Sequence, residues 1–335
     1  MKAFGLTQAG DVDTLKALDL PTPQASGTDL LVQVKAVSVN PVDTKVRGRA
    51  AASEENPCIL GFDAAGVVVA VGDRVTDFEV GDEVWYAGDL TRPGSNAEFQ
   101  LVEQAIVGHK PKSLSFAEAA ALPLTTITAW ELLFDRLRLD QTSAYQSRDL
   151  LVIGAAGGVG SILLQLAKRL TSVRVIATAS RPETQAWARE LGADLVIDHR
   201  NPLSEELDKL GIDQVDDVIS LTHTDSHFDE IVKVIAPQGQ IALIDDPAEL
   251  NVMPLKRKSV SLHWELMFTR SMFQTADRVK QQQLLNRVST LVDEGAVKTT
   301  LDQHFGAITL DNIKRAHTLL ESNKAKGKIV LEGFE

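Results

Sequence analysis

The chain has 335 residues, of which 44% are hydrophobic and 24% are charged, with a net charge of −12. This is ordinary globular composition, and the length suggests about two domains. An acidic excess without any run rich in lysine and arginine argues against nucleic acid as a partner. The single cysteine, Cys58, excludes an intramolecular disulfide and a cysteine-rich zinc site. No apolar run is long enough for a signal peptide or a membrane span, so a cytoplasmic protein without a membrane partner is expected.

The first part of the chain, residues 1–122, is predicted to be rich in β-structure. Residues 30–39 alternate between valine-rich apolar and polar positions, and residues 64–71 form an apolar run that predicts a buried strand. Shorter strands are expected at 81–85 and 97–102. Closely spaced glycine and aspartate residues separate these runs, which is typical of a compact, antiparallel, barrel-like domain.

From residue 123 onwards the pattern changes to alternating helices and strands. A helix is expected at 123–139, followed by strands at 150–153, 173–179, 195–198, 217–221, 240–244 and 259–264 and by helices at 159–170, 182–191, 204–210 and 228–235. This alternation predicts a doubly wound α/β fold with a six-stranded parallel sheet. The tail, with a helix at 277–294, is expected to return to the first domain. The predicted domains are therefore 1–122 with 270–335, and 123–269.

The stretch "LLVIGAAGGVG" at 150–160 joins an apolar strand to an amphipathic helix through a glycine-rich turn. Backbone N–H groups of such a turn and the helix N-terminus can bind a dinucleotide phosphate. The G-x-G-x-x-G pattern is imperfect, because alanine takes the first glycine position, and a bare packing turn is the alternative. The predicted cofactor-binding residues here are Ala155, Ala156, Gly157, Gly158, Val159 and Gly160.

The end of the second strand of this domain indicates which dinucleotide is bound. A site for NAD usually carries Asp or Glu there, to hold the ribose hydroxyls, whereas this strand ends in "ATASRPE". Ser180 can donate a hydrogen bond and Arg181 can pair with a 2′-phosphate, so NADPH is predicted. Alternatively, Ser180 caps the helix that opens at Pro182 and Arg181 is solvated; both interpretations can hold at once. Ligands bind outside the carboxyl ends of such strands, so Leu221, Ile244 and Asp245 are also expected to contact the cofactor.

Several ordered motifs extend the interpretation to the whole chain. They are "VSVNPVDTKVRGR" at 37–49, "GFDAAGVVVAVGDRVTDFEVGDEV" at 61–84, "ALPLTTITAWELL" at 121–133 and "AHTLLESNKAKGKIVL" at 316–331. Together with the glycine turn they resemble the medium-chain dehydrogenase/reductase superfamily, in its quinone oxidoreductase branch, including proteins called zinc-type alcohol dehydrogenase-like. The resemblance implies a GroES-like catalytic domain beside a Rossmann domain.

Zinc enzymes of this superfamily hold a catalytic metal with Cys, His and a third ligand, and a structural metal with four cysteines. Here the first cysteine position falls within 40–43, the "GHE" motif has become Gly61-Phe62-Asp63, and the cysteine-rich lobe is the short loop 87–99. Three protein ligands cannot be assembled from these residues, so no metal is expected. His223 and His227 are expected to be polar residues at the rim, with His223 ending the fourth strand.

The resemblance therefore implies metal-free transfer of hydride from NADPH to a quinone or an α,β-unsaturated carbonyl. Asn40 and Asp43 are expected near the nicotinamide, although Asn40-Pro41 could simply begin a turn. Lys45 is a possible donor to the substrate oxygen, but it could equally be solvated. No general acid is identified, since no motif supports Tyr86. Further cofactor contacts implied by the resemblance are Asn40, Thr128, His199 and Lys328.

Two other functions stay open: a zinc-type alcohol or aldehyde dehydrogenase, and a non-catalytic NADPH-binding redox sensor. The apolar segment 259–268 is expected to be the last strand of the sheet. Because an exposed edge of this kind needs covering, a homodimer formed through this strand is predicted.

Overall fold

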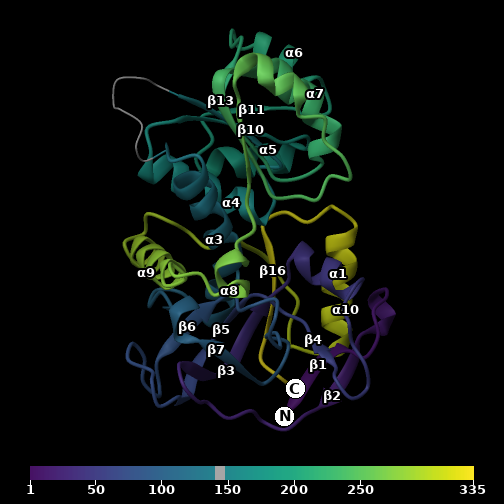
Figure 1. Ribbon diagram of the computed structural model, residues 1–335, viewed down its shortest axis with the longest axis vertical. Helices are drawn as coiled ribbons and strands as arrows, with labels where there is room; N and C mark the ends of the chain where they lie inside the picture. The colour runs from purple at the N-terminus through teal and green to yellow at the C-terminus, as the bar shows by residue number, and fades with distance from the viewer. Residues whose placement is uncertain (140–147) are drawn as a thin grey trace. The chain divides into compact units, whose positions relative to one another are not determined.

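The computed structural model describes residues 1–139 and 148–335. The chain divides into two compact units (Figure 1). Unit 1 contains residues 1–127 and 268–335, and unit 2 contains residues 128–267. Within the described residues, no helix combines the length and the apolar character that a membrane crossing requires.

Unit 1 is built on two sheets. The larger sheet has the order β15-β16-β3-β5-β6-β8, with β7 also paired to β3, and the smaller has the order β2-β1-β4. The strands are β1 (Lys2–Leu6), β2 (Lys16–Asp19), β3 (Asp29–Ser38), β4 (Cys58–Ile59), β5 (Ala64–Val71), β6 (Glu83–Tyr86), β7 (Phe99–Glu103), β8 (Val107–His109), β15 (Leu301–His304) and β16 (Lys328–Glu332). The β-rich first part is confirmed, and so is the return of the tail, because β16 pairs antiparallel with β3.

The helices of unit 1 are short, apart from two near the C-terminus. They are α1 (Pro41–Arg47), α2 (Phe116–Ala120), α8 (Thr269–Met272), α9 (Lys280–Asp293) and α10 (Leu310–Glu321), with 3-10 turns at Val12–Thr14 and Gln104–Ile106. Alternate residues of β3, such as Val32 and Val34, point into one apolar core with Ala64 and Tyr86. The registers Val32↔Val68 and Ala64↔Tyr86 explain this, since residues directly opposite one another share a face, and all four residues belong to this core.

Unit 2 contains the predicted six-stranded parallel sheet, in the order β11-β10-β9-β12-β13-β14. Its strands are β9 (Asp149–Ile153), β10 (Arg174–Thr178), β11 (Leu195–Ile197), β12 (Val215–Ser220), β13 (Ile235–Leu243) and β14 (Ser261–Trp264), and its helices are α4 (Gly158–Leu170), α5 (Pro182–Glu190), α6 (Leu203–Asp208) and α7 (Thr224–Val234). This is the 3-2-1-4-5-6 order of a doubly wound dinucleotide fold, and the order reverses between β9 and β12. The predicted fold class is confirmed.

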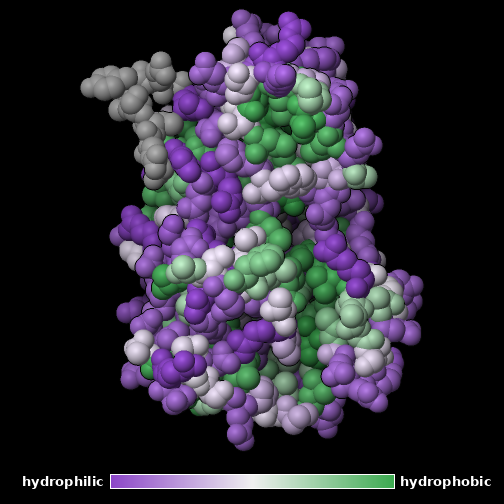
Figure 2. All heavy atoms as spheres, viewed as in Figure 1, coloured by the Kyte–Doolittle hydropathy of each residue, from purple (hydrophilic) through white to green (hydrophobic). Residues whose placement is uncertain are grey.

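Some boundaries differ from the expected ones. The helix expected at 123–139 is α3 (Pro123–Trp130) followed by a π-helical turn at Glu131–Arg136. The fourth strand ends at Ser220, so His223 does not end it; His223 has a left-handed backbone with φ 51° immediately before α7. The last strand stops at Trp264, and a further 3-10 segment, Met253–Lys258, precedes it. Figure 2 shows apolar residues gathered in patches on a largely hydrophilic face.

Candidate functional site

Most of the predicted cofactor residues of unit 2 lie at one edge of its sheet. Parallel strands end at a common edge, and the residues that follow them are brought together there. The turn with the predicted residues 155–160 follows β9, Ser180 and Arg181 follow β10, His199 follows β11, Leu221 follows β12, and Ile244 and Asp245 follow β13. The remaining predicted residue of this unit, Thr128, is buried in α3.

The glycine turn has the backbone geometry of a phosphate-binding turn. Gly154 takes φ +80°, which a side chain would strain. Gly157 is the N-cap of α4, so no side chain caps the first N–H groups of that helix. A Cβ atom on Gly160 would lie 2.4 Å from the carbonyl oxygen of Ala155, so only glycine allows this close approach of helix and strand. These features fit a dinucleotide phosphate.

Hydrogen bonds connect this turn to the neighbouring strand ends. The Gly154 N–H donates to Oγ1 of Thr178 at 3.1 Å. The same Oγ1 lies 3.2 Å from Nδ1 of His199. The Leu221 N–H donates to the carbonyl of Ile153 at 3.1 Å. The ends of β9, β10, β11 and β12 are therefore held together by specific bonds.

The end of β10 carries a cation and no carboxylate. Arg181 is the N-cap of α5, and the Thr184 hydroxyl accepts the Arg181 N–H at 3.2 Å and donates to its carbonyl at 2.9 Å. The alternative in which Ser180 caps this helix is therefore wrong. The Arg181 side chain is 41% exposed, and its Nε lies 3.1 Å from a carboxylate oxygen of Glu183.

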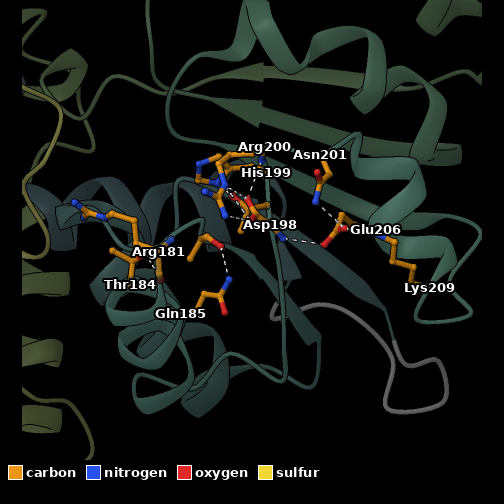
Figure 3. Close-up of polar contacts among 11 residues, drawn as sticks. Arg181, Thr184, Gln185, Asp198, His199, Arg200, Asn201, Glu206 and Lys209 are labelled. Atoms are coloured by element: carbon orange, nitrogen blue, oxygen red, sulfur yellow. Dashed lines mark hydrogen bonds and ion pairs between the residues drawn. The ribbon is translucent and has the colours of Figure 1, made fainter.

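A second arginine at this edge was missed by sequence reasoning. Figure 3 shows Arg181 and Thr184 at the start of α5, in one view with the segment Asp198–Arg200 that follows β11. The Nε of Arg200 donates to both carboxylate oxygens of Asp198 at 3.0 Å, which together with the backbone N–H of Arg200 lowers the pKa of Asp198. The only available signal was the position of "DHR" at a strand end.

Asp245 is engaged in local structure at the end of β13. Its carboxylate accepts the Thr224 N–H at 2.8 Å and also the Thr224 hydroxyl, so it holds the first turn of α7. Ile244 beside it is half-buried. The roles of Ile244 and Asp245 as cofactor contacts stay predictions.

In unit 1, the "NPVD" and "GFD" motifs meet in a buried polar cluster of Asn40, Asp43, Asp63 and Lys328. Exposure is 2% for Asn40, 0% for Asp43 and Asp63, and 3% for Lys328. The Asn40 Nδ2 donates to Oδ2 of Asp63 at 2.8 Å, and the Lys328 Nζ donates to the same oxygen at 2.9 Å. Lys328 also donates to Oδ1 of Asn40 and to the Val39 carbonyl. Two residues 288 positions apart thus share one network.

Asp43 is positioned by backbone donors. Its Oδ2 accepts the Asn40 N–H at 2.8 Å, and its Oδ1 accepts the Gly61 N–H at 3.0 Å. Burial raises the pKa of Asp43 to about 7, although these bonds and Lys328 act in the opposite direction. Burial also raises the pKa of Asp63, against Lys328 and Asn40. A cluster with one ammonium and two carboxyls can therefore hold an extra proton near neutral pH.

The three predicted catalytic residues are not all brought together. Asn40 and Asp43 lie in the buried cluster, with Asn40 as the N-cap of α1, whereas Lys45 is exposed on the same helix. Lys328, expected as a cofactor contact, belongs to the cluster as well. In the sequence Asp63 is only a motif position, and no neighbouring residue indicates its pairing with Lys328. All of these site assignments stay predictions.

The chain matches two domain families along its length. Residues 26–128 match the alcohol dehydrogenase GroES-like domain, and residues 191–331 match zinc-binding dehydrogenase. A zinc-type alcohol dehydrogenase-like protein of Staphylococcus epidermidis is 38% identical over 99% of both chains. The chloroplastic NADPH-dependent alkenal/one oxidoreductase of Arabidopsis thaliana is 33% identical over 99% of this chain and 79% of its own.

Solved structures agree with these relatives. A Rhizobium etli CFN 42 protein assigned to the zinc-dependent alcohol dehydrogenases has a TM-score of 0.97 and 53% identity, covering 100% of this chain and 98% of its own. The Escherichia coli quinone oxidoreductase complexed with NADPH has the same fold, with a TM-score of 0.84 at 24% identity over 99% and 100% of the chains. The chain belongs to the medium-chain dehydrogenase/reductase superfamily, in its quinone oxidoreductase-like branch. It is an oxidoreductase of that superfamily.

The zinc that these family names imply does not fit the residues present. At the buried cluster the side chains are two carboxyls, one amide and one ammonium, with no cysteine or histidine among them. The ammonium of Lys328 already supplies the positive charge there and would repel a dication. Across residues 1–139 and 148–335, no three His, Cys, Asp or Glu side chains gather in a way that could hold a metal ion.

Proposed function

We propose that this protein is an NADPH-dependent, zinc-independent oxidoreductase that transfers hydride to a quinone or an α,β-unsaturated carbonyl. The observation that carries the proposal is the chemistry of the buried cluster, in which Lys328 is the cation and, within the described residues, no three potential zinc ligands gather. Without a Lewis acid, acceptors that delocalise the incoming charge by conjugation are favoured. The names of the Arabidopsis alkenal/one oxidoreductase and the Escherichia coli quinone oxidoreductase support this substrate class.

The residues at the carboxyl edge of unit 2 suit NADPH. The N–H groups of Gly158, Val159 and Gly160 open α4 and would hold the pyrophosphate. Ser180 and Arg181 would receive the 2′-phosphate, because no carboxylate occupies the end of β10. When bound, NADPH supplies the hydride, while the protein contributes binding, orientation and electrostatics.

A proton must follow the hydride to complete the reduction of the acceptor. Tyr86 is a poor donor, since it is 1% exposed inside the apolar core of unit 1. Burial raises its pKa far above the ordinary value, and its hydroxyl has no hydrogen-bond partner within the described residues. Water or a substrate-side hydroxyl is the proposed proton source.

The decisive assay follows NADPH oxidation with 1,4-benzoquinone, 9,10-phenanthrenequinone and 2-alkenals, with and without a chelator. The proposal expects turnover that the chelator leaves unchanged. Chelator-sensitive oxidation of alcohols would instead establish the zinc-type dehydrogenase. Tight NADPH binding without turnover of any acceptor would establish the non-catalytic redox sensor.

The choice of cofactor can be tested at Arg181. Replacing Arg181 by alanine should weaken NADPH binding roughly 10- to 100-fold, because a charge-assisted hydrogen bond contributes about 1.5–3 kcal/mol. Binding of NADH should change little. Arg189→Ala, an exposed arginine in the last turn of the same helix, is the matched control. Equal losses for both nucleotides would contradict the 2′-phosphate assignment.

We also propose a homodimer formed through the last strand of unit 2. In the described part of the chain β14 pairs with β13 alone, and Trp264 and Leu266 are 55% and 48% exposed. Light scattering after size exclusion should give twice the chain mass at micromolar concentration. Trp264→Lys should shift that mass to the monomer, and a monomeric wild type would refute the proposal.

A further inference from the structure

Three histidines meet at the carboxyl edge of unit 2. His199 follows β11, whereas His223 and His227 stand before and inside the first turns of α7. The rings of His199 and His227 lie 6.1 Å apart, edge to face. The Nδ1 of His223 lies 2.7 Å from Oγ1 of Thr222. The histidines thus border the same edge as the glycine turn and Arg181.

Both arginines at this edge are already paired with carboxylates. Arg181 lies beside Glu183, and Arg200 is bound by Asp198. The chain as a whole carries a net charge of −12. The arginines at this edge therefore offer little uncompensated positive charge to a phosphate dianion. A group that becomes protonated can supply the additional positive charge.

The local environment favours the neutral form of two of these histidines when no ligand is present. Burial lowers the pKa of His199, and Arg200 and His223 lower it further, while Asp198 opposes them. Burial also lowers the pKa of His227, together with the other two histidines, against Asp225 and Asp245. The charged groups at this edge include Arg181, Glu183, Asp198, Arg200, Asp225, Asp245 and Asp246. A nearby phosphate would reverse the balance, because an opposite charge favours the protonated form.

The bond between His199 and Thr178 is compatible with both charge states. The Thr178 hydroxyl accepts the Gly154 N–H and can donate its own hydrogen to a neutral Nδ1. Its second lone pair can accept from Nδ1–H once the ring is protonated. The proton can therefore enter without breaking the contacts that hold the glycine turn to β10. In either charge state the Nε2–H group of His199 can donate a hydrogen bond to a ligand.

We propose that His199 and His227 form a titratable wall of the 2′-phosphate site, so that binding of NADPH takes up a proton from solvent whereas binding of NADH does not. This inference rests on the proposed use of NADPH. It assigns a role to His227, which the sequence alone predicts only as a polar residue at the rim. It also predicts that acidification towards pH 6 favours NADPH over NADH.

Isothermal titration calorimetry tests the inference directly. NADPH and NADH are each titrated at pH 7.0 in two buffers of different ionisation enthalpy, which measures the protons exchanged. We expect uptake on the order of half a proton with NADPH and none with NADH. The 2′-phosphate has a second pKa near 6, so its own contribution would be proton release. A net uptake of protons therefore cannot come from the 2′-phosphate itself, which would release them.

Variants then locate the proton. His199→Gln combined with His227→Gln should abolish most of the uptake. His304→Gln, an exposed histidine of unit 1, is the control and should keep it. If NADPH binds more tightly than NADH but without uptake, the inference fails while the cofactor assignment stands. If NADPH shows no preference over NADH, both fail. The comparison of NADPH with NADH uses the wild-type protein, so it does not depend on whether a variant folds.

Discussion

Replacing Asp43 by asparagine should change how the stability of the protein depends on pH. Burial raises the pKa of Asp43 from 3.8 to about 7 in the folded protein. The folded state therefore binds a proton more tightly than the unfolded chain. The stability linked to this group is present at low pH, decreases as pH rises from about 4 to 7, and is constant above 7. Asparagine does not titrate, so D43N lacks this decrease.

The size of the effect follows from the shift. A difference between about 7 and 3.8, at about 1.4 kcal/mol per pKa unit, gives about 4 kcal/mol, of which about 3 kcal/mol lies between pH 5 and pH 8. Asparagine keeps only one acceptor oxygen for the N–H groups of Asn40 and Gly61, which lowers stability equally at every pH. The pH dependence is therefore the informative quantity.

The assay compares the melting temperatures of wild type and D43N at pH 5 and pH 8. Relative to wild type, D43N should gain roughly 6–12 °C between the two pH values, since 1 kcal/mol corresponds to about 2–4 °C in a unit of this size. Asp19→Asn, at a side chain that is 98% exposed, serves as the control for the loss of a charge and should change little. An equal difference between wild type and D43N at both pH values would refute a protonated Asp43 in the fold.

Three further predictions concern buried groups. Lys328→Met leaves the Asp63 carboxylate without its cation and should lower the free energy of unfolding by about 3–5 kcal/mol, more at pH 8 than at pH 5, as urea midpoints would show. Tyr86→Phe removes a buried hydroxyl that has no hydrogen-bond partner in the described residues; kcat should be retained and stability unchanged or about 1 kcal/mol higher, and a large loss of kcat would restore Tyr86 as the proton donor. Gly160→Ala places a Cβ atom 2.4 Å from the Ala155 carbonyl oxygen, so stability should fall by about 1–3 kcal/mol and NADPH should bind more weakly in a fluorescence titration. An unchanged melting temperature would contradict that close approach.

The fold of unit 2 was predictable because its signals are local. Strands such as β9 and β10 contain a short apolar run, and α4 shows its apolar stripe directly after the glycine turn. The π-helical turn at Glu131–Arg136 was not predictable from the sequence. A π-helical turn contains one extra residue, but its residue types are those of an ordinary α-helix. The end of the fourth strand was also not predictable, because His223 adopts a left-handed backbone conformation, which is uncommon for residues other than glycine.

The sequence by itself determined the superfamily, the glycine turn and the absence of an acid at the end of β10, because each depends on motifs of residues that are adjacent in the sequence. Only the tertiary structure decided the surroundings of those residues. It showed that Asn40 and Lys328 bind one another inside unit 1, across 288 positions of the chain, and that three histidines from two strand ends share one edge of unit 2. Charge state depends on burial and on neighbours that are distant in sequence, so the protonation of Asp43 and of His199 could be inferred only after the fold had brought those neighbours together.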